Sequence, residues 1–297
     1  MDEWSRASNR CGSLIIVYLI HNWRADVLDL CSMVLGFVAA VAITVIVHRK
    51  FRQAQVVARL KIDGADGIVE EQFVSIGGID QFISIRGEDR RNPALLVVHG
   101  GPGSCYSIFT PHLRPWEKHF TIVQWDQRGA GKTFARLGSH GTGKITMNQL
   151  ASDTIEVAQY LRERLHQDRI FLLASSMGST FGLHAVRIRP DLFFAYIGTD
   201  QNVGMVHGHE ENYRQVMRRL NIQGTSKGVR FLERIGPDPK LWTQSDFTTF
   251  VQWTMKSDHS GYSRTMKLLK DAVWYAPGWT LRDIRAFVKV CIFRCSS

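Results

Sequence analysis

The sequence predicts an α/β fold, a mainly parallel sheet with helices on both faces, preceded by one transmembrane helix. Three observations predict this arrangement. An uncharged run near the N-terminus has the length of a membrane helix, short apolar runs alternate with helix-like segments further along, and one apolar run leads through a serine into a helix. Strands that alternate with helices along a chain form parallel sheets covered by those helices.

Composition places the chain among globular proteins. Of its 297 residues, 44% are apolar, which is enough to bury a sizeable core. The formal net charge is +10, but the basic residues are scattered and are not grouped with aromatic residues as on a nucleic-acid surface. The five cysteines form neither a CxxC pair nor a zinc-binding pattern. We therefore expect no nucleic acid and no bound metal ion among its ligands.

Residues 30–47, LCSMVLGFVAAVAITVIV, contain no charge and predict a transmembrane helix. A signal peptide would carry its basic residues before the apolar run, whereas here they follow it, at residues 48–52. A core helix would carry a stripe of charged side chains, and no charged residue interrupts this run. We expect a single-pass protein anchored in the lipid bilayer by residues 30–47, with residues 1–29 before the span. The positive-inside rule places the rest in the cytoplasm.

The segment after the span predicts a linker and then a sheet. Residues 48–68 are polar and include two glycines close to aspartates, which is typical of a linker. Two β-like runs, residues 71–76 and 81–85, flank Gly77 and Gly78 and predict a hairpin. Continuous apolar runs then predict strands that are covered on both faces, at residues 94–98, 120–125, 170–173 and 193–198.

A capping-box pattern at Thr146 and Gln149 predicts the start of a helix between two of these strands. Its apolar face comprises Leu150, Val157, Ala158, Leu161 and Leu165. We expect an α/β core over residues 69–204. The remaining residues, 205–297, are predicted to be mainly helical and rich in aromatic side chains.

The strongest chemical signal is the run FLLASSMGST at residues 171–180, an apolar strand that leads through small-x-Ser-x-Gly into a helix. Such a turn exposes the serine hydroxyl at the end of a sheet, and it requires small residues two positions before and after that serine. Ala174 and Gly178 meet this requirement for Ser176. Ser176 is therefore the candidate catalytic nucleophile. An ordinary helix N-cap has a similar sequence, so the pattern alone is weak.

A second motif, HGGPG at residues 99–103, directly follows the apolar run 94–98. Glycines there allow backbone N–H groups to face a developing oxyanion without an intervening side chain. A simple Gly-Pro turn is the alternative. We expect Gly100 or Gly101, together with the N–H of Met177, to form an oxyanion hole.

With WDQRGAGKT at residues 125–133, these motifs resemble the proline iminopeptidases of the α/β-hydrolase superfamily over residues 70–235. The resemblance implies an α/β-hydrolase fold with a helical cap. It also implies removal of N-terminal residues, often proline, from peptides without a cofactor, or action on small amides or esters. By the same resemblance, Asp126 and Arg128 support the site and are not catalytic.

The end of that segment, GAGKT, also looks like part of a phosphate-binding P-loop. The P-loop motif requires a glycine where this chain has Asp126. A carboxylate at that position would repel phosphate, so we expect no nucleotide partner.

The family pattern is incomplete after Ser176. A serine hydrolase of this fold takes an acid and then a histidine from loops after later strands. The residues that follow the cap match neither a Gly-x-x-Asp loop nor a closing histidine, so we expect this chain to be weak or inactive. His207, His209 and His259 are the nearest alternative bases.

One further expectation concerns the helical region. The family places carboxylates in the cap to hold the substrate's free amino group, and Glu210 and Glu211 are the candidates here. The competing interpretation is a truncated, non-catalytic protein that serves as a membrane-bound interaction module.

Overall fold

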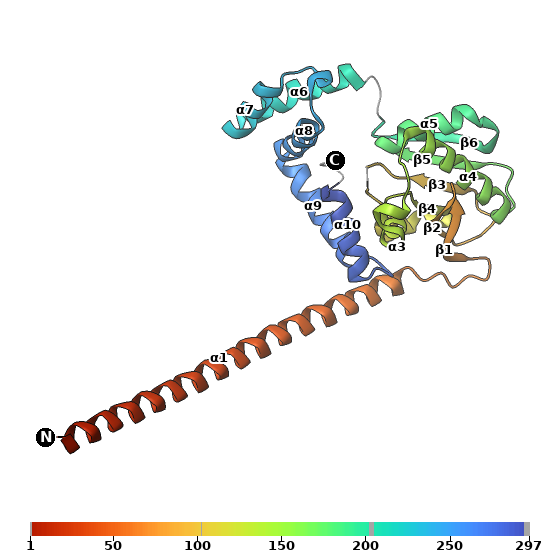
Figure 1. Ribbon diagram of the computed structural model, residues 1–297. Coiled ribbons are helices and arrows are strands. Elements are labelled where there is room, and N and C mark those ends of the chain that lie inside the picture. The colour runs from red at the N-terminus through yellow and green to blue at the C-terminus, as the bar shows by residue number, and fades with distance from the viewer. Residues whose placement is uncertain (1, 102, 202–204, 294–297) are drawn as a thin grey trace. The chain divides into compact units, whose positions relative to one another are not determined.

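The computed structural model describes residues 2–101, 103–201 and 205–293 (Figure 1). The chain divides into two compact units, Met1–Ala54 and Gln55–Ser297. Helix α1, Asp2–Arg59, makes up the first unit, and its last residues, 55–59, are counted with the second. This helix extends beyond the predicted span on both sides, and the linker is shorter than predicted. Residues 48–59 are helical because they contain no glycine or proline and several strong helix formers.

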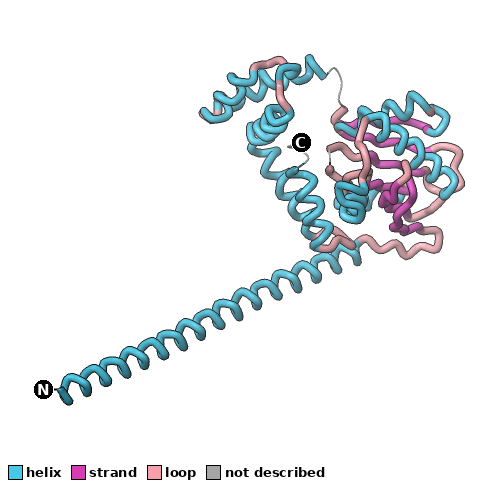
Figure 2. The backbone as a smooth tube through the Cα atoms, in the orientation of Figure 1, coloured by secondary structure: helices cyan, strands magenta, loops and turns pink. Residues whose placement is uncertain are grey.

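Six strands form one mixed sheet (Figure 2). Their order is β1-β2-β4-β3-β5-β6, with antiparallel pairing at the β1–β2 and β2–β4 contacts and parallel pairing elsewhere. The strands are β1 Ile68–Ile76, β2 Ile79–Gly87, β3 Ala94–Val98, β4 Thr121–Asp126, β5 Ile170–Ser175 and β6 Phe193–Thr199. All the predicted strands are therefore confirmed, with small shifts at their ends.

The predicted hairpin turns at Gly77 and Gly78, as the sequence indicates. Ile76 pairs with Ile79, which leaves a two-residue turn. Gly77 and Gly78 have φ angles of 57° and 77°, a conformation that L-residues with a side chain rarely adopt. Two positive φ angles in succession match the twist of the flanking strands.

Different helices cover the two faces of the sheet. On one face, Leu96 and Leu172 belong to a buried cluster with residues of α4, Met147–Leu165, and α5, Met177–Ile188. On the other face, Leu95 and Val97 pack with Tyr106 and Leu113. The short elements there are η1 Ser107–Phe109, α2 Thr110–Leu113 and η2 Arg114–Lys118. Helix α3, Gly131–Gly141, follows β4, and η3, Pro190–Leu192, precedes β6.

The predicted N-terminus of α4 is confirmed at Thr146, whose hydroxyl accepts a hydrogen bond from the backbone N–H of Gln149 at 3.1 Å. The Gln149 side chain does not complete the capping box. It donates instead to Asp153 at 2.8 Å, one turn further along the helix.

The region after β6 is helical, as predicted. Helices α6, α7 and α8 share a cluster that includes Val216, Leu232 and Phe250. Trp279 and Phe287 pack with Cys105 and Ile108 near η1. The elements are α6 Met205–Ile222, α7 Ser226–Ile235, η4 Pro239–Leu241, α8 Gln244–Ser257, α9 His259–Trp274 and α10 Leu281–Phe293.

Candidate active site

Ser176 lies at the turn between β5 and α5. Its backbone has φ 51° and ψ −125°, outside the usual regions for a residue with a side chain. Its N–H donates to the carbonyl of Thr199 at 3.0 Å, so the adjacent β6 holds the turn in place. Strain of this kind persists where surrounding structure imposes it, and it is common at functional sites.

The requirement for a small residue after Ser176 has a direct steric cause. A Cβ on Gly178 would lie 2.6 Å from the carbonyl oxygen of His99 and 2.8 Å from that of Val98. Helix α5 therefore packs against the end of β3 without space for a methyl group. Ala174, on the other side of the serine, is fully buried.

The structure brings the glycine loop against Ser176. A Cβ on Gly100 would lie 2.7 Å from the Cβ and 3.3 Å from the Oγ of Ser176. Gly101 has φ 120°, which again favours glycine. Met177 is the first residue of α5, where backbone N–H groups lack helical partners. The three residues predicted to form the oxyanion hole thus lie in the two segments that meet at Ser176. Pro102 lies outside the described residues.

His99 is buried beneath this loop and is neutral. Its Nε2 accepts from the backbone N–H of Gln127 at 3.4 Å, which places the ring proton on Nδ1, 2.7 Å from the Gly100 carbonyl oxygen. Burial lowers the pKa of His99 to about 4, although the contact with Gly100 opposes this shift. His99 therefore fixes the loop and is not free to accept a proton from Ser176.

A hydrogen-bonded chain that the sequence did not reveal lies beside the nucleophile. The Tyr106 hydroxyl donates to the Ser175 Oγ at 2.9 Å, and the Ser175 hydroxyl donates to Asp200 Oδ2 at 3.4 Å. Asp200 follows β6 and has φ 48°, unusual for a residue other than glycine. Asp200 directly follows a predicted strand, and the carboxyl ends of parallel strands meet at one edge of the sheet. This position was the sequence signal that could have placed Asp200 near Ser176.

Comparison with known proteins agrees with this geometry. The family described as alpha/beta hydrolase fold matches residues 93–225. The chain has the α/β-hydrolase fold. It is 36% identical over 192 residues to a probable aminopeptidase, YbaC, of Bacillus subtilis, covering 64% of this chain and 59% of that protein. It is also 28% identical over 116 residues to a proline iminopeptidase of Lactobacillus delbrueckii, covering 39% of this chain and 38% of that protein.

Among solved structures, a proline iminopeptidase-related protein of Thermus thermophilus aligns with a TM-score of 0.41 and 17% identity, over 77% of this chain and 94% of that one. The predicted resemblance to proline iminopeptidases is confirmed at the level of sequence similarity. The chain spans about 59% of the length of the Bacillus relative and 38% of the Lactobacillus relative.

Within this fold, Arg128 makes the contacts expected of a supporting residue. Its guanidinium forms a buried ion pair with Asp153 of α4 at 2.5 Å and donates to the carbonyl of Gly77 at 3.0 Å. Asp153 also accepts from Gln81 of β2 at 2.9 Å. The cluster therefore joins the hairpin, the segment after β4 and helix α4.

Asp126 is the other residue predicted to support the site. Its Oδ2 accepts from the backbone N–H of Lys132 at 2.8 Å, across the turn into α3. Burial raises the pKa of Asp126 to about 6, and the Lys132 backbone hydrogen bond opposes this rise. A Cβ on Gly131 would lie 2.1 Å from the Asp126 Oδ2, so the carboxylate fills the space beneath this loop.

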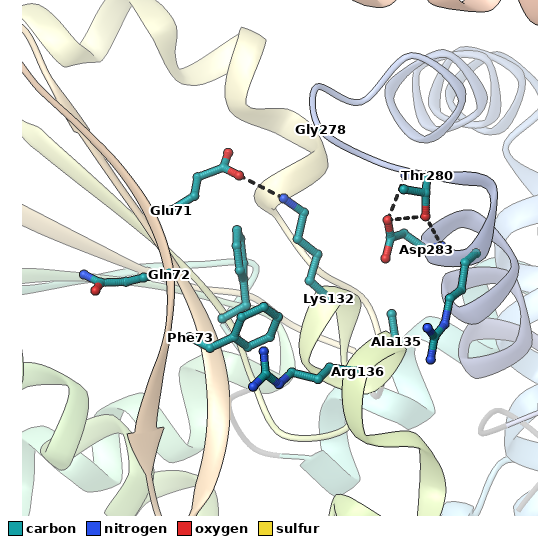
Figure 3. Close-up of a pocket in the computed structure, with 11 residues that line it drawn as sticks. Glu71, Gln72, Phe73, Lys132, Ala135, Arg136, Gly278, Thr280 and Asp283 are labelled. Atoms are coloured by element: carbon teal, nitrogen blue, oxygen red, sulfur yellow. Dashed lines mark hydrogen bonds and ion pairs between the residues drawn. The ribbon is translucent and has the colours of Figure 1, made fainter.

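Near Lys132 lies a cavity of about 540 Å³ that does not include Ser176 among its lining residues. The Lys132 ammonium pairs there with Glu71 at 3.0 Å (Figure 3). It also lies 4.2 Å from the centre of the Phe82 ring. Arg136 covers the Phe73 ring in the same way, at 4.3 Å. Charged groups of both signs line this cavity.

The other predicted site residues are not placed at Ser176 by any described contact. Glu210 and Glu211 lie on α6, and both form ion pairs with Arg214 of the same helix, at 3.8 and 3.5 Å. The His209 ring packs edge-on against Phe247. The side chains of His207 and His259 lie outside the described residues. Within the described part of the chain, no histidine ring forms a hydrogen bond with Ser176.

Helix α1 includes a candidate membrane span. Within its segment Cys31–Arg59, the most apolar stretch of 18 residues has a mean hydropathy of 2.3, and none of this stretch is buried. Length and composition suit a membrane helix, and a signal sequence near an N-terminus shares these features. Across the described residues, no group of three or more His, Cys, Asp or Glu side chains could hold a metal ion.

Proposed function

We propose that this α/β-hydrolase is a serine hydrolase of the aminopeptidase type, with Ser176 as its nucleophile. The observation that supports this most strongly is the backbone of Ser176, held at φ 51° between strand and helix with Gly100 directly against it. Ser176 Oγ would attack an acyl carbon, and the backbone N–H groups of Gly101 and Met177 would stabilise the oxyanion.

The substrates we propose are peptides with a free N-terminus, and small amides or esters. Sequence similarity to a probable aminopeptidase and to proline iminopeptidases supports this class. Glu210 or Glu211 would bind the substrate's ammonium group, since their helix α6 lies in the predicted cap region. A single membrane helix within residues 30–47 would anchor the enzyme, supported by the exposed apolar surface of α1.

Ser176 needs a general base to react rapidly. The described residues place no histidine at its hydroxyl, and this observation favours the second candidate function, a non-catalytic interaction module. Loss of one triad member lowers the rate of a serine hydrolase by several orders of magnitude. With only the described residues to assist Ser176, the proposed enzyme would turn over slowly at most.

Labelling of the full chain with a fluorophosphonate probe tests these candidates. Labelling that disappears in Ser176→Ala supports the nucleophile assignment, and labelling that persists in that variant contradicts it. Ser179→Ala is the matched control, because Ser179 lies one turn into α5 and its hydroxyl donates to the Ser176 carbonyl at 2.6 Å. Complete absence of labelling in a folded chain supports the non-catalytic module.

A further inference from the structure

Helix α10 presents three cations on one face. Arg282, Arg285 and Lys289 are spaced by three and four residues, which places them side by side along the helix. All three are exposed. In the described part of the chain none of the three has a hydrogen-bond or ion-pair partner. Like charges at this spacing repel one another, so an anion bound among them would stabilise the helix.

These cations line a cavity of about 700 Å³ together with residues of α3. Phe134, Leu137 and Val288 supply apolar surface to the same cavity. No carboxylate is among the described residues that line it. The groove between α3 and α10 therefore combines uncompensated positive charge with apolar surface.

The neighbouring cavity near Lys132 is different in charge. It shares Arg282 with the α3–α10 groove, but it also contains Glu71 and Asp283. Glu71 already neutralises Lys132 (Figure 3). An anion is consequently favoured in the α3–α10 groove and not in the neighbouring cavity.

The exposed surface of α10 also indicates the kind of anion. Leu281 is 54% exposed and Val288 is 43% exposed, on the same helix as the three cations. Helices with basic side chains beside exposed apolar ones bind at the boundary between lipid headgroups and acyl chains. Helix α1 of the same chain exposes a long apolar surface of its own, which also favours a lipid partner.

We propose that the α3–α10 groove binds the headgroup of an anionic phospholipid at a bilayer surface. The guanidinium groups of Arg282 and Arg285 would donate paired hydrogen bonds to phosphate oxygens. Lys289 would add a third charge, while Val288 and Leu137 contact the first acyl carbons. This lipid site lies outside the peptidase function proposed above and does not depend on it.

Hydrogen exchange tests the proposal on the full chain mixed with lipid vesicles. The vesicles contain phosphatidylcholine alone, or phosphatidylcholine and phosphatidylserine in equal amounts. We expect amide exchange in residues 281–290 to slow only with the anionic vesicles. At high salt, which screens exposed charges, the exchange rate should return to its value without anionic lipid. Each cation near an anionic leaflet contributes about five-fold in affinity. The triple variant R282Q/R285Q/K289Q should therefore need on the order of 100-fold more anionic lipid for the same protection.

The matched control is R218Q/K227Q/R230Q, which removes three exposed cations from α6 and α7 and leaves α10 unchanged. We expect this control to keep the protection of residues 281–290. Loss of protection in the control would contradict the proposal, because it would show general charge attraction. Equal exchange with both kinds of vesicle, or no association with anionic vesicles, would also overturn it. Protection by inorganic phosphate with phosphatidylcholine vesicles would overturn the assignment to lipid.

Discussion

A side chain on Gly100 would place its Cβ 2.7 Å from the Cβ of Ser176, closer than non-bonded carbons approach. The same atom would lie 3.0 Å from the carbonyl oxygen of Ser175. The glycine loop around Gly100 and the turn at Ser176 therefore pack with no space for an added methyl group.

We expect Gly100→Ala to lower the free energy of unfolding by about 1–3 kcal/mol, because either the loop or the turn must shift. Urea denaturation measures this loss. Gly36→Ala is the control, since a Cβ on Gly36 in helix α1 has no neighbour within 4 Å. Equal effects of the two substitutions would show that the close contact at Gly100 is unimportant.

Removing one partner of the buried pair of Arg128 and Asp153 should cost far more stability than removing one partner of an exposed pair. We expect Asp153→Ala to destabilise the protein by about 3–5 kcal/mol, because it leaves the Arg128 charge buried without its partner. Asp191→Ala breaks the exposed pair with Arg189 and should change stability by less than about 1 kcal/mol. Urea unfolding of both variants checks the difference, and similar losses would contradict it.

Two buried groups give stability a pH dependence of opposite sign. The folded pKa of His99 is about 4, below its ordinary 6.5, so the unfolded chain binds more protons in this window and stability rises with pH. The folded pKa of Asp126 is about 6, above its ordinary 3.8, so the folded chain binds more protons there and stability falls as pH rises. The two effects partly cancel between about pH 4 and 6.

Asp126→Asn removes the second effect and should make unfolding free energy rise more steeply with pH. The added slope approaches about 1.4 kcal/mol per pH unit in the middle of the window. Urea unfolding at several pH values between 4 and 7 measures the slope. A slope unchanged from the parent protein would contradict the shifted pKa of Asp126.

The N-terminus of α4 provides a local test. Thr146→Ala removes the hydroxyl that accepts from Gln149, and we expect it to destabilise the protein by about 1 kcal/mol. Thr225→Ala is the control, because Thr225 precedes α7 without a side-chain capping bond. Thermal unfolding compares the two, and an equal loss in Thr225→Ala would rule out capping as the cause.

The sequence predicted the sheet well because the four later strands are mainly apolar and the first two flank a two-glycine turn. It also predicted Ser176 and Gly100 as neighbours, since the conformational demands of both motifs are local. The contact of Asp200 with Ser175 was not predicted, because it depends on the pairing of β5 with β6. The length of α1 was underestimated because the change from apolar to basic residues does not end a helix.

The cluster around Asp153 also sets an order of events during synthesis. Gln81 leaves the ribosome 72 residues before Asp153, the carboxylate to which its amide donates. Until α4 forms, the polar groups of the hairpin and of Arg128 remain in contact with water, and burial without Asp153 would be unfavourable. The hairpin should therefore dock late although it is translated before the rest of the sheet, and the core should become protected from proteases in one cooperative step.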